Sequence, residues 1–497
     1  MLLWAIVGAG FPGVALCDGG VRNEISGLLE YRSTNGVLYA TLEAKPQTVL
    51  FSNSGLGVNT SVNGLTYNGE YAGPVLRVHP GDVMHITLIN HLSEPTNLHF
   101  HGLHTTPQGH GDNVHIKVYP GQSFEYVIPI PSTQPPGLYW YHAHLHGMSE
   151  EQVMGGLSGA LVIEGFQEQF PELANVSEHI FILKDHVFEH SRDPVIHDIL
   201  HDRVESANGQ LFSEITMQPG ETQLWRFTNQ SANLYFHIAL KGHTFRIIGN
   251  DGVSATRETI VKTLDIMPAG RMEVLVTAGE PGEYSFVAER SPIGTSGAYT
   301  LDRVIGKLTV AGEKDTPVAD LVQFPEKENL LRRKVDKYRV ITFSENVPKN
   351  AYYVNDRLYD EDRMDIRVPL GNVEEWSIRN DSNDLHVFHI HQVHFQVVEI
   401  NGVPQLFNGY ADNVYVPERG AVRIRMAFTD PRILGRFVYH CHVLQHEDAG
   451  MMANIEVYDK QESQFGRLWK NMGYCCTGQF SVDCIWSNLA LLAKEFL

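Results

Sequence analysis

The chain has 497 residues, of which 43% are hydrophobic and 19% charged, a profile that is typical of a folded globular protein and excludes long disorder. At roughly 150 residues per domain, this length predicts about three domains. Asp and Glu total 58 against 38 Lys and Arg, so the net charge is −20. Such a surface repels phosphate backbones, which argues against nucleic acid as a partner.

Residues 1–17 form an apolar segment that is too short to span a bilayer and that fits a secretory signal, although no Lys or Arg precedes Arg22. We therefore expect a secreted or periplasmic protein with no membrane span. A buried N-terminal segment and a misassigned start codon are the alternatives. The five cysteines contain no CxxC pair, so neither a zinc ribbon nor a thioredoxin-like redox site is expected.

Short β-rich runs broken by Gly, Pro, Asn and Asp dominate the chain, and helical periodicity is scarce. Many short strands with frequent turns predict β-sandwiches or barrels. The expected strands include residues 83–89, 124–130, 223–227, 272–276, 307–310 and 422–428. The predicted domains cover residues 25–165, 166–318 and 319–460, and they are followed by a cysteine-bearing tail over 461–497, to which we assign no role.

Four histidine clusters lie in apolar, aromatic-rich runs that we expect to be strands. Each contains a His-x-His pair, whose two side chains share one face of a strand. Eight buried imidazoles without a metal would each need a hydrogen-bond partner, whereas a shared metal cluster satisfies them together. The pairs are His99 with His101, His142 with His144, His389 with His391, and His440 with His442.

A second set of ligand residues is expected on the opposite face of the same strands. Cys441 lies between two paired histidines and therefore points away from them, and His386 precedes His389 by an odd offset. His446 and Met451 follow Cys441 in an expected loop. Two imidazoles, a thiolate and a weak axial thioether are the ligands of a blue-copper electron-transfer site. The sequence thus predicts two metal centres back to back, joined through the backbone of Cys441.

A single His-x-His in a strand is more often structural than metal-binding. Four such pairs together with a Cys-x4-His-x4-Met run argue strongly against a purely structural interpretation. Several further histidines near the clusters are expected to be outer partners or solvated groups: His104, His110, His115, His146 and His394.

These motifs resemble those of three-domain multicopper oxidases of the laccase type, over about residues 60 to 458, and most of all the bacterial-type members. The resemblance implies an all-β fold of three consecutive cupredoxin-like Greek-key β-sandwich or barrel domains, with a copper-free middle domain as a spacer and four copper ions in total. It implies type 1 copper at His386, Cys441, His446 and Met451, and type 2 copper at His99 and His389. It implies a type 3 pair at His101, His142, His144, His391, His440 and His442.

Two acidic residues are the candidate catalytic groups, as proton carriers. Asp112 follows the first histidine motif, where many relatives of the resembled family carry an acid, and the alternative is that it only turns the loop. Glu447 directly follows His446.

The expected partners are O₂ and a small electron donor, and the expected state is a monomer. The leading function is oxidation of phenols and similar one-electron donors, coupled to reduction of O₂ to water. The alternatives are a metal-ion oxidase for cuprous, ferrous or manganous ions, and a copper-binding or electron-carrier protein without turnover.

Overall fold

The computed structural model describes residues 20–23, 27–53, 58–187, 203–292, 299–321 and 323–460. The expected signal segment and the cysteine-bearing tail lie outside these residues. In the described part, strands form six sheets and the helices are few and short, which confirms the all-β prediction. None of the helices described is long and apolar enough to cross a membrane.

The first domain packs a six-stranded sheet against a four-stranded one. The larger sheet has the order β1 (Val21–Arg22), β2 (Leu29–Arg32), β5 (Gly73–Val78), β10 (Ser158–Ile163), β9 (Gly137–His142) and β7 (His99–His101). The smaller has the order β4 (Val58–Tyr67), β3 (Val37–Asn53), β6 (Val83–Asn90) and β8 (Ser123–Pro129). Helix α1 (Ser149–Gly155) lies between β9 and β10 in the chain.

The second domain is built from a six-stranded and a five-stranded sheet. The first has the order β12 (Arg203–Ala207), β11 (Glu178–Val187), β14 (Thr222–Asn229), β19 (Arg271–Thr277), β16 (Phe245–Asn250) and β17 (Val253–Val261). The second has the order β13 (Ser213–Met217), β21 (Arg303–Val310), β20 (Gly282–Glu289), β15 (Phe236–Leu240) and β18 (Thr263–Ile266).

The third domain repeats this arrangement and adds helix α2 (Leu444–Asp448) after strand β31 (Gly435–Cys441). Its larger sheet has the order β23 (Ala351–Val354), β22 (Lys337–Asn346), β25 (Val373–Asn380), β30 (Ala421–Ala427), β27 (Phe395–Ile400) and β28 (Val403–Pro404). Its smaller sheet has the order β24 (Ile366–Pro369), β32 (Met452–Tyr458), β31 (Gly435–Cys441), β26 (His386–Ile390) and β29 (Asn413–Val416).

The three domains share one feature of their topology, although the first has a different distribution of strands between its two sheets. In each, the closing strand pairs parallel with an earlier strand: β10 with β5, β21 with β13 and β32 with β24. Buried and partly exposed residues alternate along β6 and β30, so one face of each packs on a core, as expected for strands in sandwich sheets. Each domain has its own large hydrophobic cluster.

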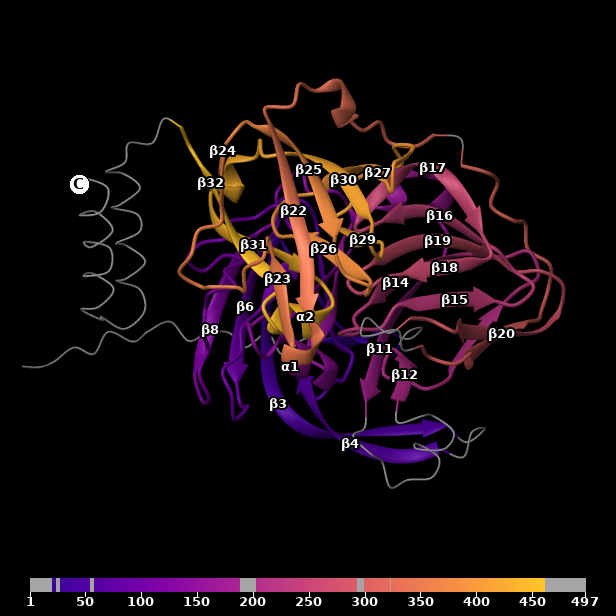
Figure 1. The fold of residues 1–497 in the computed structure, drawn as a ribbon. Coiled ribbons are helices and arrows are strands. Elements are labelled where there is room, and N and C mark those ends of the chain that lie inside the picture. The colour runs from indigo at the N-terminus through magenta and orange to yellow at the C-terminus, as the bar shows by residue number, and fades with distance from the viewer. Residues whose placement is uncertain are drawn as a thin grey trace, which may run out of the picture.

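The domains meet around the two helices (Figure 1). Val153 of α1, Ala232 of the second domain and Leu444 of α2 form a small buried cluster with one residue from each domain. Leu444 N–H also donates to Ala232 C=O at 3.0 Å. The side chain of Asp448 accepts hydrogen bonds from the backbone N–H groups of residues 147, 149 and 150, at the start of α1. The chain after β31 is therefore held by both other domains.

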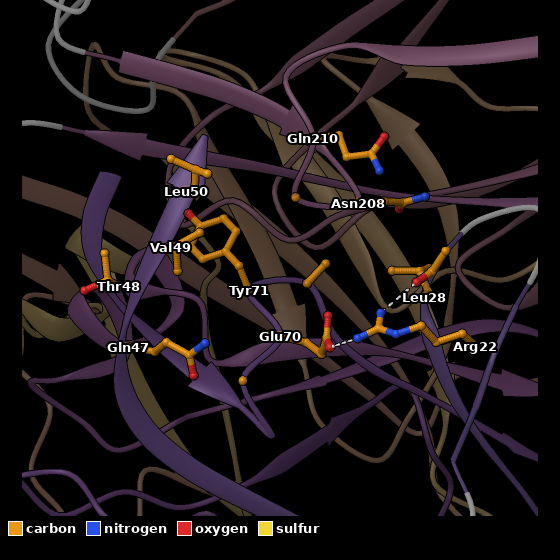
Figure 2. Close-up of a pocket in the computed structure, with 14 residues that line it drawn as sticks. Arg22, Leu28, Gln47, Thr48, Val49, Leu50, Glu70, Tyr71, Asn208 and Gln210 are labelled. Atoms are coloured by element: carbon orange, nitrogen blue, oxygen red, sulfur yellow. Dashed lines mark hydrogen bonds and ion pairs between the residues drawn. The ribbon is translucent and has the colours of Figure 1, made fainter. Parts of the chain in front are cut away.

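A polar cavity of about 280 Å³ lies where the first two domains meet, between the strand segment 47–50 and the turn 208–210 (Figure 2). Arg22 pairs with Glu70 at 2.5 Å on its wall and donates to Gly27 C=O at 3.0 Å. None of the residues that line it is a histidine or a cysteine, so this cavity is separate from the predicted metal residues.

Candidate copper centres

The four His-x-His pairs converge where the first and third domains face one another. In the first domain, His99 on β7 pairs across the sheet with His142 on β9, and in the third, His389 on β26 pairs with His440 on β31. The two sets interleave: the ring of His99 stacks on that of His391 with centroids 3.7 Å apart, and His101 on His389 at 3.8 Å. All eight side chains are buried, with at most 2% exposed.

The expectation that every pair lies within a strand is wrong in detail. Strand β9 ends at His142, β26 ends at Ile390 and β31 ends at Cys441, so the second histidine of three pairs lies just beyond its strand. The chain still returns these side chains to the cluster, because His442 N–H donates to Val387 C=O and His144 N–H donates to the Asn97 side chain.

The imidazole nitrogens are arranged as a metal site requires. The Nε2 atoms of His99, His101, His142, His389 and His442 are buried and have no hydrogen-bond partner. The Nε2 atoms of the other three histidines converge on one another, with His440 Nε2 3.1 Å from that of His144 and 3.2 Å from that of His391. Buried polar atoms are normally paired, so inward-facing nitrogens without partners fit bound cations.

The opposite ring nitrogens of five of these histidines are anchored to the protein. The Nδ1 atoms of His99 and His101 lie 3.0 Å from carboxylates, those of Asp112 and Asp412 respectively. Backbone carbonyls hold Nδ1 of three more: His142 by Ala143 at 2.9 Å, His389 by Asp412 at 2.7 Å, and His440 by Cys441 at 3.0 Å. An anchor on one ring nitrogen fixes the tautomer and leaves the other as a metal ligand.

Burial keeps these imidazoles neutral. It lowers the pKa of His101 and of His144 to about 4 each, although a nearby carboxylate opposes the effect in both cases. Burial, reinforced by neighbouring imidazoles, lowers the pKa well below the usual value for His99, His142, His389, His391 and His442. A neutral imidazole has the lone pair that a metal needs.

Ligand atoms of the eight histidines form overlapping groups, and those of His99, His101 and His389 lie within 4.8 Å of one another. Ligand atoms of His144, His391 and His440 lie within 4.8 Å of one another. The rings of His101, His142 and His442 form a further trio with centroids 5.2–6.2 Å apart. The rings of His99 and His389 have centroids 5.9 Å apart, and the division of the eight histidines between type 2 and type 3 copper stays a prediction.

A separate pocket on the other side of β26 and β31 gathers a thiol and two imidazoles. Cys441 Sγ lies 3.5 Å from Nδ1 of His386 and 3.7 Å from Nδ1 of His446, and these nitrogens are 3.1 Å apart. All three residues are fully buried. The Ser382 hydroxyl lies 2.8 Å from His386 Nε2 and orients that ring. This donor set fits a type 1 copper.

Met451 is fully buried in the same hydrophobic cluster as Cys441. Its backbone N–H donates to His446 C=O at 2.9 Å, and its C=O accepts from Cys441 N–H at 3.1 Å. The segment that contains His446 is not the expected loop but helix α2, which is held by the second domain. The helical turn closes the chain into a tight loop that keeps Met451 next to both ligands.

Burial raises the pKa of the Cys441 thiol to about 12, so the group is protonated in the absence of a metal. Thiolate is the form that binds copper, and copper binding must therefore displace this proton.

Asp112 lies against the histidine cluster rather than at the surface. It is 1% exposed, and besides His99 its carboxylate accepts hydrogen bonds from Phe100 N–H at 2.9 Å and from Gln392 Nε2 at 2.6 Å. Burial raises the pKa of Asp112 to about 8, although these two hydrogen bonds oppose the rise. Gly109 and Gly111 lie in this loop, but the carboxylate does more than turn it, because it contacts the imidazole of His99 on β7.

Glu447 contacts two other histidines of the cluster. Its carboxylate is 2.9 Å from His440 Nδ1 and 3.7 Å from His144 Nδ1, and it accepts a hydrogen bond from the Ser149 hydroxyl at 2.8 Å. Burial works against ionisation, but His144 and His440 hold the pKa of Glu447 well below its usual range. With Asp412 at His101, three buried carboxylates therefore contact the cluster.

Sequence reasoning missed several residues that contact these groups, among them Ser149, Arg271, Gln392 and Asp412. Gln392 directly follows His391, and this position next to a candidate ligand is the one sequence signal that could have identified it. The other three come from distant segments and carry no motif. Of the remaining histidines, His104 and His394 pair with each other, Nε2 to Nδ1, at 2.6 Å, outside both metal pockets.

Comparisons with known proteins agree with this geometry. Three consecutive segments, residues 53–168, 167–303 and 330–461, each match the family description "Multicopper oxidase". The chain is 25% identical over 438 residues to multicopper oxidase mco of Staphylococcus aureus, covering 86% of this chain and 90% of that protein. It is 26% identical over 414 residues to cell division protein FtsP of Xenorhabdus nematophila, covering 78% and 84%.

A solved structure with the same fold is the multicopper oxidase from Campylobacter jejuni, which is described as a metallo-oxidase. It is 25% identical, has a TM-score of 0.71 and covers 85% of this chain and 92% of its own. The fold, the two metal pockets and the three matched segments together show that the chain belongs to the three-domain multicopper oxidases.

Proposed function

We propose that this protein is a copper oxidase that takes single electrons from a small donor and reduces O₂ to water. The observation that carries the proposal is that adjacent residues lie in two different metal pockets: Cys441 belongs to one, and its chain neighbours His440 and His442 belong to the other. Four donors would each lose one electron, and O₂ would accept four electrons and four protons to give two molecules of water.

Bound copper would supply reversible one-electron transfer in the Cys441 pocket and the O₂-reducing centre among the eight histidines. The proposed type 1 ligands are His386, Cys441, His446 and Met451, and the proposed type 2 ligands are His99 and His389. The proposed type 3 ligands are His101, His142, His144, His391, His440 and His442. Four ions would then be bound per chain.

The chain's own residues would manage orientation and protons. The carboxylates and carbonyls at Nδ1 hold the rings so that Nε2 faces inward. Asp112 and Glu447 lie within hydrogen-bond reach of His99 and His440, and they are the two proposed proton carriers.

Phenolic and similar one-electron donors are the first donor class. His446 is fully buried, and the Tyr352 ring stacks on it with centroids 4.3 Å apart. A donor would therefore pass its electron across this cover without bonding to the imidazole. Such outer-sphere transfer demands little of donor shape and suits small aromatic molecules.

Oxidation of a metal ion is the second candidate, and one observation favours it. The carboxylates of Glu345 and Asp384 both act on Tyr352, whose pKa is raised to about 12 by burial and by these negative charges. A cation would be attracted to this side of the type 1 pocket. The solved relative from Campylobacter jejuni is described as a metallo-oxidase, which supports the same alternative.

Oxygen uptake by copper-loaded protein tests both candidates. We expect uptake with a methoxyphenol donor that disappears when copper is removed and returns when it is added back. Faster uptake with cuprous or ferrous ion than with the phenol, and its selective loss in Glu345→Gln, would identify the metal ion as the donor.

A copper-binding role without turnover is the remaining alternative. It is supported by the similarity to a relative that is named as a cell division protein and not as an oxidase. Copper-loaded protein that consumes no O₂ with any of these donors would favour it. Export and a monomeric state remain part of the proposal. Detection in the extracellular or periplasmic fraction and sedimentation of the purified protein test them.

A further inference from the structure

The second domain contributes none of the proposed copper ligands, yet one of its side chains reaches the histidine cluster. Arg271, the first residue of β19, is fully buried. Its Nη1 and Nη2 each donate to one oxygen of the Asp412 carboxylate, both at 2.7 Å. Arg271 Nη1 also lies 3.1 Å from His101 Nδ1. The guanidinium therefore holds a third-domain carboxylate against a first-domain imidazole.

Asp412 contacts two of the eight histidines. Its side chain lies 3.0 Å from Nδ1 of His101, and its backbone carbonyl lies 2.7 Å from Nδ1 of His389. One residue thus anchors an imidazole from each of the two domains that form the cluster. The bidentate contact from Arg271 fixes the carboxylate plane, which a single hydrogen bond would leave free to rotate.

Arg271 is itself held in place by its own domain and by the first. Its Nη1 donates to Ala269 C=O at 3.0 Å, its Nε donates to Leu138 C=O at 3.4 Å, and its Nη1 lies 3.5 Å from the Asp251 carboxylate. The space around the pair is filled. A Cβ added at Gly102, where φ is +85°, would lie 2.6 Å from Asp412 Oδ2 and 3.0 Å from Arg271 Nη2.

We propose that Arg271 is a positioning residue for the copper cluster, and that it acts through Asp412 on the orientation of His101. The middle domain is then more than a spacer, because it sets one ligand of a centre that lies between the other two domains. This inference rests on the proposed function in one respect, that His101 binds copper.

The test compares Arg271→Met with a matched control, Arg226→Met. Arg226 is also a buried arginine of the second domain, and it pairs with Glu178 at 2.9 Å without contact to any proposed ligand. Copper affinity of the purified full chain is measured by chelator competition, and the magnetic coupling of bound copper by EPR. Loss of a residue that orients a metal ligand typically costs about 10- to 100-fold in metal affinity.

We expect Arg271→Met to bind one copper of the cluster about 10- to 100-fold more weakly and to gain an EPR signal from uncoupled copper, while the type 1 signal stays unchanged. Arg226→Met should keep the wild-type affinity and coupling. Arg271→Lys retains the charge but not the two-pronged contact and should lose part of the affinity. Asp412→Asn should reproduce Arg271→Met if that variant does not fold.

Full copper affinity and coupling in Arg271→Lys and Asp412→Asn would overturn the inference. So would equal thermal destabilisation of Arg271→Met and Arg226→Met with no change in copper binding, since that result marks Arg271 as an interdomain contact only. Wild-type protein that binds no copper in the histidine cluster would instead refute the proposed function. The two failures are therefore distinguishable.

Discussion

The Asp112 carboxylate lies 3.0 Å from Nδ1 of His99, and neither side chain is exposed beyond 1%. Gln392, which follows a proposed ligand of the third domain, donates to the same carboxylate at 2.6 Å. Asp112 therefore links the two halves of the histidine cluster. Its position allows it both to orient His99 and to hold a proton beside the O₂-reducing centre.

Replacement of Asp112 by asparagine should separate these roles. Asparagine can still accept a hydrogen bond from His99, but it cannot carry a proton. We expect the donor to bleach the blue colour at the wild-type rate, and reoxidation by O₂ to slow by roughly 10²–10⁴-fold. Stopped-flow absorbance, first without and then with O₂, measures the two half-reactions.

Asp430→Asn is the control, because Asp430 accepts a hydrogen bond from Arg432 N–H at 2.9 Å, pairs with the Arg432 side chain and contacts no proposed copper ligand. Reoxidation of Asp112→Asn at the wild-type rate, at both acidic and neutral pH, would show that Asp112 is structural.

Cys441→Ser should remove the blue colour. A thiolate bound to Cu(II) gives intense visible absorption, and a serine hydroxyl does not. The eight histidines lie on the other side of the strands, so the variant should still bind the copper ions of that cluster. Visible absorption together with copper content per chain checks this prediction. A blue band that persists in the variant would refute the type 1 assignment.

Lys184 should make stability depend on pH. This side chain is fully buried between the first two domains, where its Nζ donates to the Ser158 hydroxyl at 2.6 Å and lies over the Tyr71 ring. Burial lowers the pKa of Lys184 to about 7, against an opposing effect of Asp185. The folded state therefore binds fewer protons than the unfolded state between about pH 7 and the ordinary lysine pKa, and stability should rise with pH in that window.

The measurement is the urea midpoint of wild type and Lys184→Met from pH 6 upwards. The unfolding free energy of wild type minus that of Lys184→Met should rise by up to about 1.4 kcal/mol per pH unit above pH 7. Below pH 7 this difference should not change with pH. Lys241→Met, at an exposed lysine of the same domain, should show no such slope. Parallel curves for wild type and Lys184→Met would mean that this amine titrates normally.

The strands were predictable because their pattern is local. The segments expected at 83–89 and 422–428 are β6 and β30, shifted by one residue at most, since alternation of buried and exposed side chains is visible in a short window. The ligand candidates were recognisable for a similar reason: paired histidines two residues apart, four times over, have little other explanation.

The contacts around the ligands could not be predicted in the same way. Arg271 and Asp412 are 141 residues apart and come from different domains, so no local pattern connects them. The segment after Cys441 was expected as a loop but is helix α2, because its backbone N–H groups are bound by Ala232 and Asn233 of the second domain. Both features depend on how the domains pack, which a motif does not encode.

Met451→Leu should raise the reduction potential of the type 1 copper. A thioether that donates weakly along the axis stabilises Cu(II) relative to Cu(I), and leucine of similar volume removes this donation with little disturbance of the packing. For a one-electron couple, a tenfold change in relative affinity corresponds to about 59 mV, and we expect an upward shift on the order of one such step. Donors that are harder to oxidise should then become substrates, and the variant should retain copper more weakly.

Met452→Leu is the matched control: Met452 is equally buried but packs with Val114 and Val438, away from the Cys441 cluster. A redox titration of the blue band in the three proteins decides the matter, and an equal or lower potential in Met451→Leu would remove Met451 from the copper.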